Sequence, residues 1–322
     1  MSTRKTQSES NPFPYSDTNK RYYTYDYYLR KAYGGKCVKI PLDGGFSCPN
    51  RENGGTGCIY CSSRGSGDFT EGASLSISEQ YLRIREKLSK KWETNRTIPY
   101  LQAYTNTYAP IEVLRKTYEE VLSLSDAVAF HIATRPDCLP EDVLSLLSEV
   151  SERIPLTVEL GLQTANDETA KLIGRGHSFL DFLSGYRALR ERVPAARIAV
   201  HLIDGLPYED IETMLSTAKA VAVLRPDEVK IHLLYVLRGT PLASLYEKGG
   251  YTPLSREAYI ETVVRQLELL PPETVIARLT GDGEETNLIA PLWSKKKVTV
   301  LNDIDKLLYE RNTYQGRLFD EK

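Results

Sequence analysis

The chain has few cysteines and no long apolar segment, and both shortages exclude classes of protein. Five cysteines among 322 residues are too few for a scaffold built on disulfides. No apolar run approaches the roughly 18 residues that a membrane span needs, and the polar N-terminal residues do not predict a signal peptide. The sequence therefore predicts a cytoplasmic protein with no membrane partner, in which clustered thiols serve metal binding or catalysis.

Net charge is also small. The 41 basic and 43 acidic side chains leave a total of −2, which argues against a general nucleic-acid binder. The charge is uneven along the chain, because residues 1–40 hold eight basic and three acidic side chains. That segment therefore carries +5 and the remaining 282 residues carry −7, which leaves room for a local basic surface.

Short apolar segments alternate with helical patterns between residues 36 and 235. We expect strands over 36–42, 98–104, 127–133, 156–162, 197–203 and 228–235. Between them we expect helices over 78–92, with Ser78 as N-cap, and over 110–124, 141–150, 167–173, 180–193 and 211–224. This alternation predicts a parallel α/β sheet, and six units fit either an open sheet or an incomplete barrel.

The rhythm changes after residue 235. A helix is expected over 255–270, a strand over 275–279 and a second helix over 298–309. The sequence therefore predicts three parts: a basic, tyrosine-rich segment (1–35), a β/α domain (36–235) and a C-terminal α+β extension (236–322). Residues 1–14 are expected to be disordered.

Three cysteines lie in one glycine-rich loop after the first expected strand. Nine residues separate Cys48 from Cys58, and two separate Cys58 from Cys61. Sulfur ligands select zinc or iron–sulfur clusters. Structural zinc and most electron-transfer clusters take four ligands, whereas three cysteines leave one iron of a [4Fe–4S] cube open. The spacing and the aromatic Tyr60 favour a cluster; the alternative is a zinc site whose fourth ligand is Cys37 or a distant histidine.

The loop resembles the cluster motif of the radical S-adenosylmethionine (SAM) superfamily. Over roughly residues 20–315, the chain resembles more narrowly the Elp3-like branch and its bacterial YtqA/YhcC type. The segments that carry this resemblance are 48–61, 102–110, 134–137, 159–164, 175–177, 201–207, 230–234 and 278–282.

The resemblance implies a partial (β/α)6 radical SAM barrel with the cluster at the carboxyl ends of its strands. It implies a [4Fe–4S] cluster on Cys48, Cys58 and Cys61, with SAM chelated to the open iron. One electron cleaves SAM, and the resulting 5′-deoxyadenosyl radical abstracts hydrogen from the substrate. The SAM contacts that it implies are Tyr60, Gln102, Tyr104, Asn106, Glu159, Gln163, Ile203 and Gly205.

Several polar residues have a structural alternative. Glu159 lies in an apolar strand and could instead pair with Arg135 or Arg197, since a buried carboxylate needs a partner. We expect His177 and His201 to make structural hydrogen bonds. Cys37 and Cys138 are expected to be structural thiols.

The Elp3-like branch acts on the wobble uridine of tRNA. The resemblance therefore implies a tRNA-modifying enzyme that trims carboxymethylaminomethyluridine toward aminomethyluridine, with an electron donor such as flavodoxin or ferredoxin. The alternatives are a radical SAM enzyme acting on a small molecule, such as a tetrapyrrole precursor, and a zinc-stabilised binding protein without catalysis. The residues expected to contact the substrate are Tyr27, Arg30, Lys31, Tyr108, Arg135, Arg175 and Arg278.

The tyrosine-rich segment supports RNA binding on its own chemistry. Basic side chains beside stackable aromatic rings suit a single-stranded loop. The alternative is a helix over 22–33 that packs across the barrel opening and buries Tyr25, Tyr28 and Leu29.

Overall fold

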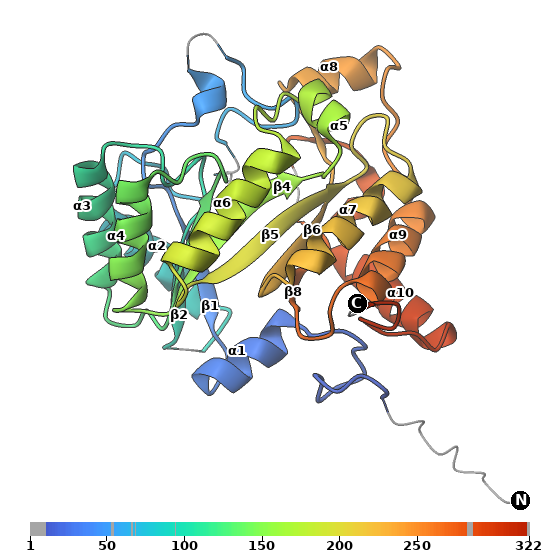
Figure 1. The fold of residues 1–322 in the computed structure, drawn as a ribbon, viewed down its shortest axis with the longest axis horizontal. Coiled ribbons are helices and arrows are strands. Elements are labelled where there is room, and N and C mark those ends of the chain that lie inside the picture. The colour runs from blue at the N-terminus through green and yellow to red at the C-terminus, as the bar shows by residue number, and fades with distance from the viewer. Residues whose placement is uncertain are drawn as a thin grey trace, which may run out of the picture.

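The computed structural model describes residues 11–52, 55–65, 67, 69–93, 95–281 and 286–320. Its centre is a seven-stranded parallel sheet that curls into an open half-barrel, with helices covering the outer face (Figure 1). In spatial order the strands are β1 (Val38–Leu42), β2 (Thr97–Leu101), β3 (Phe130–Thr134), β4 (Leu156–Gln163), β5 (Arg197–Asp204), β6 (Glu228–Leu233) and β8 (Val275–Arg278). The expected α/β class and partial barrel are confirmed.

The crossover helices bury an apolar stripe against the sheet. α4 shows the pattern, because Val143, Leu144, Leu147 and Val150 are buried at helical spacing while the acidic residues of its first turn remain outside. The crossover helices are α2 (Ile77–Ser89), α3 (Ile111–Leu122), α4 (Glu141–Ser151), α5 (Asp167–Leu172), α6 (Phe179–Arg192) and α7 (Ile211–Leu224).

The N-cap of α2 differs from the predicted one. Ser76, not Ser78, caps the helix: its hydroxyl accepts from the Glu79 N–H, and the Glu79 carboxylate accepts from the Ser76 N–H. This reciprocal capping box satisfies two backbone donors, which a cap at Ser78 could not do without a carboxylate three residues later.

The C-terminal region completes the barrel sheet. β8 pairs in parallel with β6, with Lys230 opposite Arg278, so the sheet has seven strands where six were expected in the β/α domain. Periodicity finds a strand but does not tell which sheet it joins. The expected strand over 228–235 ends at Leu233, and a small antiparallel pair follows. This region also contains β7 (Val236–Leu237), α8 (Pro241–Glu247), α9 (Arg256–Leu269), β9 (Leu288–Ala290) and α10 (Lys297–Glu310).

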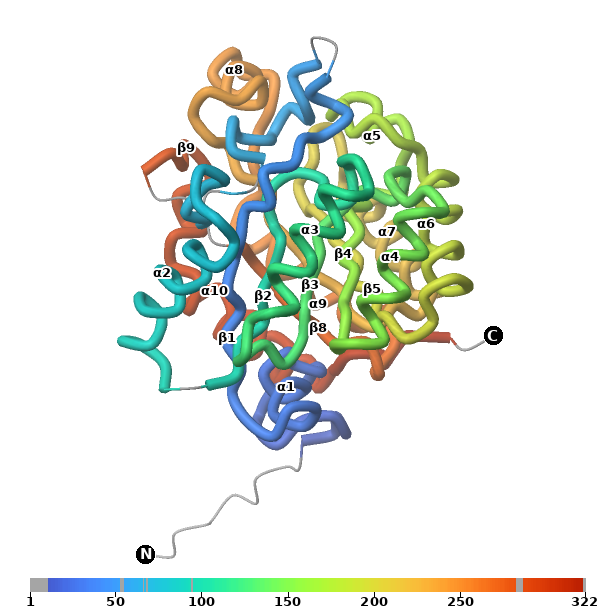
Figure 2. The backbone as a smooth tube through the Cα atoms, turned by 90° about the vertical axis from the view of Figure 1, so that its left-hand side faces the viewer, coloured from blue at the N-terminus to red at the C-terminus, as the bar shows by residue number. Residues whose placement is uncertain are grey.

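The N-terminal segment closes the end of the barrel where the strands begin. Helix α1 (Tyr25–Tyr33) lies at that end, opposite the cysteine loop (Figures 1 and 2). The Ile276 N–H of β8 donates to the Tyr23 carbonyl at 2.8 Å, which ties the segment to the sheet. Disorder was the wrong prediction for residues 11–14, because Phe13 is buried with 3% of its surface exposed. Residues 1–10 lie outside the described part of the chain.

None of the helices in the described ranges has the length and apolar character of a membrane-crossing segment.

Candidate active site

One cavity of about 650 Å³ extends from the cysteine loop into the barrel as far as Tyr25 of α1. Every strand of the half-barrel contributes to its wall. Side chains alternate along a strand, so residues two apart face the same side, as Glu159, Gly161 and Gln163 of β4 do here. Of the residues predicted for the site, the cavity wall contains Cys48, Cys58, Tyr60, Cys61, Gln102, Tyr104, Arg135, Glu159, Gln163, Arg175, Ile203 and Arg278.

The three cysteines of the loop lie on the cavity wall at its outer end. The Cys61 N–H donates to the Cys58 carbonyl at 3.0 Å, which makes the tight turn that brings these two residues together. Burial raises the pKa of the Cys58 thiol, and burial with the neighbouring Cys58 raises that of Cys61 to about 12. Buried thiols of this kind become good ligands when a metal takes the place of their protons.

Across the described ranges, no group of three or more histidine, cysteine or acidic side chains is already assembled as a metal site. Whether these residues suit a metal cluster is therefore judged from their donor atoms and their position. Cys48, Cys58 and Cys61 supply three sulfur atoms on the wall of one cavity, which leaves space beside them. These residues fit an iron–sulfur cluster with one iron free of a protein ligand.

The cysteine loop is fastened to the segment that follows α5. Asn50 donates from its side-chain amide to the carbonyls of Gly174 at 3.0 Å and Arg175 at 2.6 Å. The Ile59 N–H donates to the Ile173 carbonyl at 2.9 Å. Gly176 has φ +80°, and a Cβ there would lie 2.2 Å from the Asn50 side-chain oxygen, so this contact requires glycine.

Arg175 supports this connection from inside the protein. Only 1% of its surface is exposed, and its guanidinium donates to the Leu162 carbonyl at 2.5 Å and the His177 carbonyl at 2.9 Å. Arg135 donates to the Arg175 carbonyl at 2.7 Å and pairs with Asp137 at 2.7 Å. The guanidinium N–H groups of Arg135 and Arg175 are thus already hydrogen-bonded within the protein.

Glu159 is the centre of a buried polar cluster deeper in the barrel. Its carboxylate lies 2.6 Å from Lys39, 2.7 Å from His131 and 2.8 Å from His201, and it also pairs with Lys230. These partners come from β1, β3, β5 and β6. The two arginines expected as alternative partners pair elsewhere, since Arg135 holds Asp137 and Arg197 holds Glu228.

The charges in this cluster follow from burial and pairing. Burial alone would raise the pKa of Glu159, but Lys230, Lys39 and the two histidines hold it well below its usual value. Burial lowers the pKa of His131 to about 3 and that of His201 to about 4. Glu159 is therefore ionised and both histidines are neutral donors at neutral pH.

Some predicted site residues lie away from the cavity wall. Asn106 is fully buried and its amide donates to the carbonyls of Leu101 at 3.1 Å and Ala133 at 2.8 Å, so it joins β2 to β3. Gly205 has φ +83°, and its carbonyl accepts from the Tyr251 hydroxyl at 2.7 Å.

The residues predicted on the N-terminal segment are at the other end of the barrel. Tyr27, Arg30 and Lys31 belong to α1, and Arg30 pairs with Asp17 at 2.6 Å and Asp26 at 2.9 Å. The structure therefore does not bring these three together with the cysteines (Figure 2).

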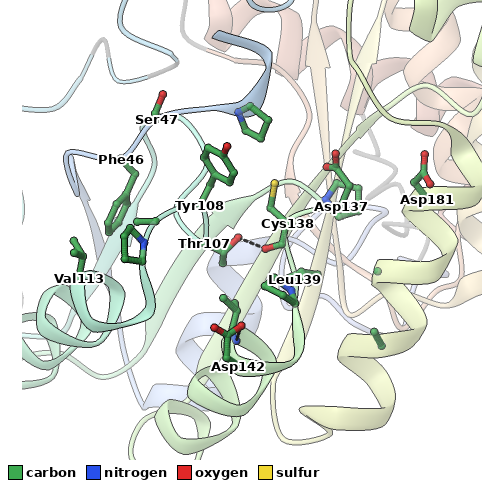
Figure 3. Close-up of a pocket in the computed structure, with 18 of the residues that line it drawn as sticks. Phe46, Ser47, Thr107, Tyr108, Val113, Asp137, Cys138, Leu139, Asp142 and Asp181 are labelled. Atoms are coloured by element: carbon green, nitrogen blue, oxygen red, sulfur yellow. Dashed lines mark hydrogen bonds between the residues drawn. The ribbon is translucent and has the colours of Figure 1, made fainter. Parts of the chain in front are cut away.

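Tyr108 lines a second cavity, outside the barrel. This cavity of about 1240 Å³ lies between the cysteine loop and the amino ends of α3, α4 and α6 (Figure 3). The Tyr108 hydroxyl donates to Glu52 at 2.6 Å, and the Thr107 hydroxyl donates to the Cys138 carbonyl at 2.6 Å. The acidic side chains on its wall are Glu52, Asp137, Asp142 and Asp181.

Sequence reasoning missed four residues of the barrel interior: Lys39, His131, Lys230 and His232. A signal existed for the lysines, because each interrupts an expected apolar strand at a position that alternation turns inward. His131 and His232 also lie within expected strands, but nothing in the sequence pairs them with Glu159 or Arg278.

Two family models match most of the chain. Residues 47–221 match the Radical SAM superfamily, and residues 226–310 match the Radical_SAM C-terminal domain. The chain belongs to the radical SAM superfamily. This family uses a [4Fe–4S] cluster and SAM, so the chain is a radical SAM enzyme with these cofactors.

Individual relatives confirm the branch that the sequence resembles. The uncharacterized protein YtqA of Bacillus subtilis is 48% identical over 315 residues, which cover 97% of each chain. A tRNA uridine(34) acetyltransferase of Methanocaldococcus infernus is 28% identical over 183 residues, 54% of this chain and 33% of that protein. The structure of M. infernus Elp3, lacking residues 1–46, has the same fold with a TM-score of 0.65, at 20% identity over 87% of this chain and 64% of that one.

Proposed function

We propose that this radical SAM enzyme modifies the wobble uridine of tRNA in the cytoplasm, converting a carboxymethylaminomethyl side chain to aminomethyl. The observation that supports it most is the cavity, whose wall runs from the cysteine loop to charged residues inside the barrel. An unstacked base can enter such a cavity and direct its side chain inward. The named activity of the M. infernus relative on uridine 34 supports the same substrate class.

The proposed reaction balances with SAM as the oxidant. Reductively cleaved SAM supplies an acceptor for one hydrogen atom. The carboxymethyl carbon loses that hydrogen atom, the resulting radical loses one electron, and the neighbouring amine nitrogen loses one proton, which leaves a carbon–nitrogen double bond (an imine) on the substrate. Water then hydrolyses the imine, so the carbon–nitrogen bond breaks, the amine stays on the base and glyoxylate leaves. The electron released balances the one that cleaved SAM, which an electron donor such as flavodoxin or ferredoxin first provides.

The test uses anaerobically reconstituted enzyme with SAM, a reductant and an anticodon stem–loop that carries carboxymethylaminomethyluridine. We expect aminomethyluridine, glyoxylate and 5′-deoxyadenosine in equal amounts by mass spectrometry. Cys61→Ser should abolish all three, while Cys37→Ser, a half-buried thiol outside the cavity wall, should retain them. Release of 5′-deoxyadenosine with an unchanged stem–loop would contradict the tRNA substrate and leave the enzyme class intact.

A further inference from the structure

The inner part of the barrel cavity holds more positive than negative charge. Lys39, Lys230 and Arg278 all lie on its wall, and Glu159 is the one carboxylate beside them among the described lining residues. Glu159 already pairs with both lysines. A single carboxylate neutralises one of three cations, so the interior carries a surplus of about two charges when the lysines are protonated.

The register of β6 and β8 shows where the surplus positive charge of the cavity lies. Lys230 of β6 lies directly opposite Arg278 of β8, and His232 follows Lys230 by two residues on the same face. All three belong to the cavity wall. They therefore form one patch on the β6–β8 side of the barrel.

Arg278 differs from the other arginines of the cavity wall. Arg175 donates to backbone carbonyls, and Arg135 pairs with Asp137. The guanidinium of Arg278 makes no hydrogen bond or ion pair with any residue in the described ranges, although Arg278 lies opposite Lys230 in the sheet. Arg278 is half-buried, and the Nε2 atom of His232 is buried without a hydrogen-bond partner in the described ranges. Buried polar groups without partners are rare in proteins, because leaving one unpaired is unfavourable unless a ligand or a water molecule binds it.

The electrostatics of Lys230 agree with a missing anion. Burial, followed by the like charges of Lys39 and Arg278, opposes its protonated form despite Glu159, and its pKa falls to about 7. A second anion near Lys230 and Arg278 would favour the ammonium form and relieve this repulsion.

The closed end of the barrel restricts which anion can reach this patch. Tyr25 of α1 lies on the cavity wall, and its hydroxyl is 3.3 Å from His131. A phosphodiester continues in both directions and does not fit a closed end. A terminal anion on a flexible arm does, and the planar fork of an arginine matches a carboxylate.

We propose that Lys230, His232 and Arg278 form the receptor for a terminal carboxylate of the substrate. This carboxylate belongs to the carboxymethyl group of the wobble side chain, so this inference rests on the proposed function. Binding it on β6 and β8 inside the barrel sets how deep the side chain enters, and it thereby sets which carbon faces the cysteine end. Arg278 and Lys230 are positioning residues in this sense, and the receptor distinguishes substrate from product, since the product has no carboxylate.

The test measures binding to the anaerobic holoenzyme with SAM, using two small probes. N-Methylglycine reproduces the amino-carboxylate arm, and dimethylamine is the same arm without the carboxylate. By ligand-observed NMR, we expect N-methylglycine to bind and dimethylamine not to. Arg278→Gln should weaken N-methylglycine roughly 10- to 100-fold, as loss of a charged hydrogen bond predicts. Arg278→Lys should fall between, because it keeps the charge and loses the fork.

Arg265→Gln is the matched control, since Arg265 pairs with Glu212 on the outer surface. Equal affinity of Arg278→Gln and wild type for N-methylglycine would overturn the receptor, as would tighter binding of inorganic phosphate. A parallel loss of SAM affinity in Arg278→Gln would also overturn it, because the anion would then be the carboxylate of SAM.

A second arm separates this inference from the proposed function. It compares two anticodon stem–loops that differ only in carrying carboxymethylaminomethyluridine or aminomethyluridine. If N-methylglycine binding depends on Arg278 but neither stem–loop binds, the receptor stands and the tRNA substrate fails. If both stem–loops bind equally in wild type and in Arg278→Gln, the tRNA substrate stands and the receptor fails.

Discussion

Glu159 and the two lysines beside it stabilise one another's charges inside the barrel. Lys39 and Lys230 pair with its two oxygens, and His131 and His201 donate to the same carboxylate. Removing a carboxylate from such a cluster leaves the lysines without their counter-charge in a region that water reaches poorly. Loss of one partner of a buried ion pair is costlier than loss of the whole pair.

We therefore expect Glu159→Gln to lower the free energy of unfolding by about 3–5 kcal/mol, as broken buried pairs do. The double variant Glu159→Gln with Lys230→Met should recover part of this loss, because it also removes an unpaired charge. Urea unfolding of both variants measures the difference. Glu119→Gln is the control, since Glu119 forms an exposed pair with Arg153, and it should change stability little. An equal loss in Glu119→Gln would contradict the special role of burial.

The same residue marks the limit of sequence analysis for the site. The cysteine spacing predicts the cluster ligands because all three lie within 14 residues, and local spacing constrains what they bind. The structural alternative for Glu159 was an ion pair with an arginine, whereas it pairs with Lys39, 120 residues away in the chain. Barrel closure brings these residues together, and no local pattern encodes it.

At the scale of elements, helix periodicity predicted most of the fold but not the position of α1. The segment was expected either as an RNA-binding surface or as a helix across the barrel opening. It forms a helix that buries Leu29, with Tyr25 and Tyr28 packed nearby. The end of the barrel that it covers could not be predicted, because that depends on the pairing of Thr24 with Ile276 of β8.

The placement of α1 makes a prediction about RNA. A stem–loop that enters at the cysteine end should not need the far side of α1, so the triple variant Tyr27→Ala, Arg30→Gln, Lys31→Gln should bind it within about twofold of wild type. Fluorescence anisotropy with a labelled anticodon stem–loop measures the affinity. Circular dichroism should show that the variant is folded. A tenfold weaker affinity in the folded variant would mean that RNA also reaches the closed end.

At the scale of the whole molecule, burial of ionisable groups makes the fold sensitive to acid. The chain has four histidines, and burial lowers the pKa of every one: His131, His177, His201 and His232. Below pH 6.5 the unfolded chain binds protons at these positions and the folded chain does not, so stability falls as pH decreases. Asp204 acts in the opposite direction, because burial raises its pKa to about 7 and the folded state takes up its proton first.

These opposing effects predict a net loss of stability between pH 7.5 and pH 5.5. At pH 5.5 each histidine contributes a loss of about 1.4 kcal/mol, which is about 5.6 kcal/mol for four. Lys230, with its pKa of about 7, adds about 0.8 kcal/mol, and Asp204 offsets about 2 kcal/mol, which leaves about 4.4 kcal/mol. Urea unfolding of the cluster-free protein at both values measures it. Asp204→Asn keeps an acceptor for the Gln266 amide but removes the offset, so its loss over the same interval should approach about 6.4 kcal/mol. An equal loss in Asp204→Asn and wild type would contradict the raised pKa, because it would show that Asp204 is still ionised in the folded protein at pH 5.5.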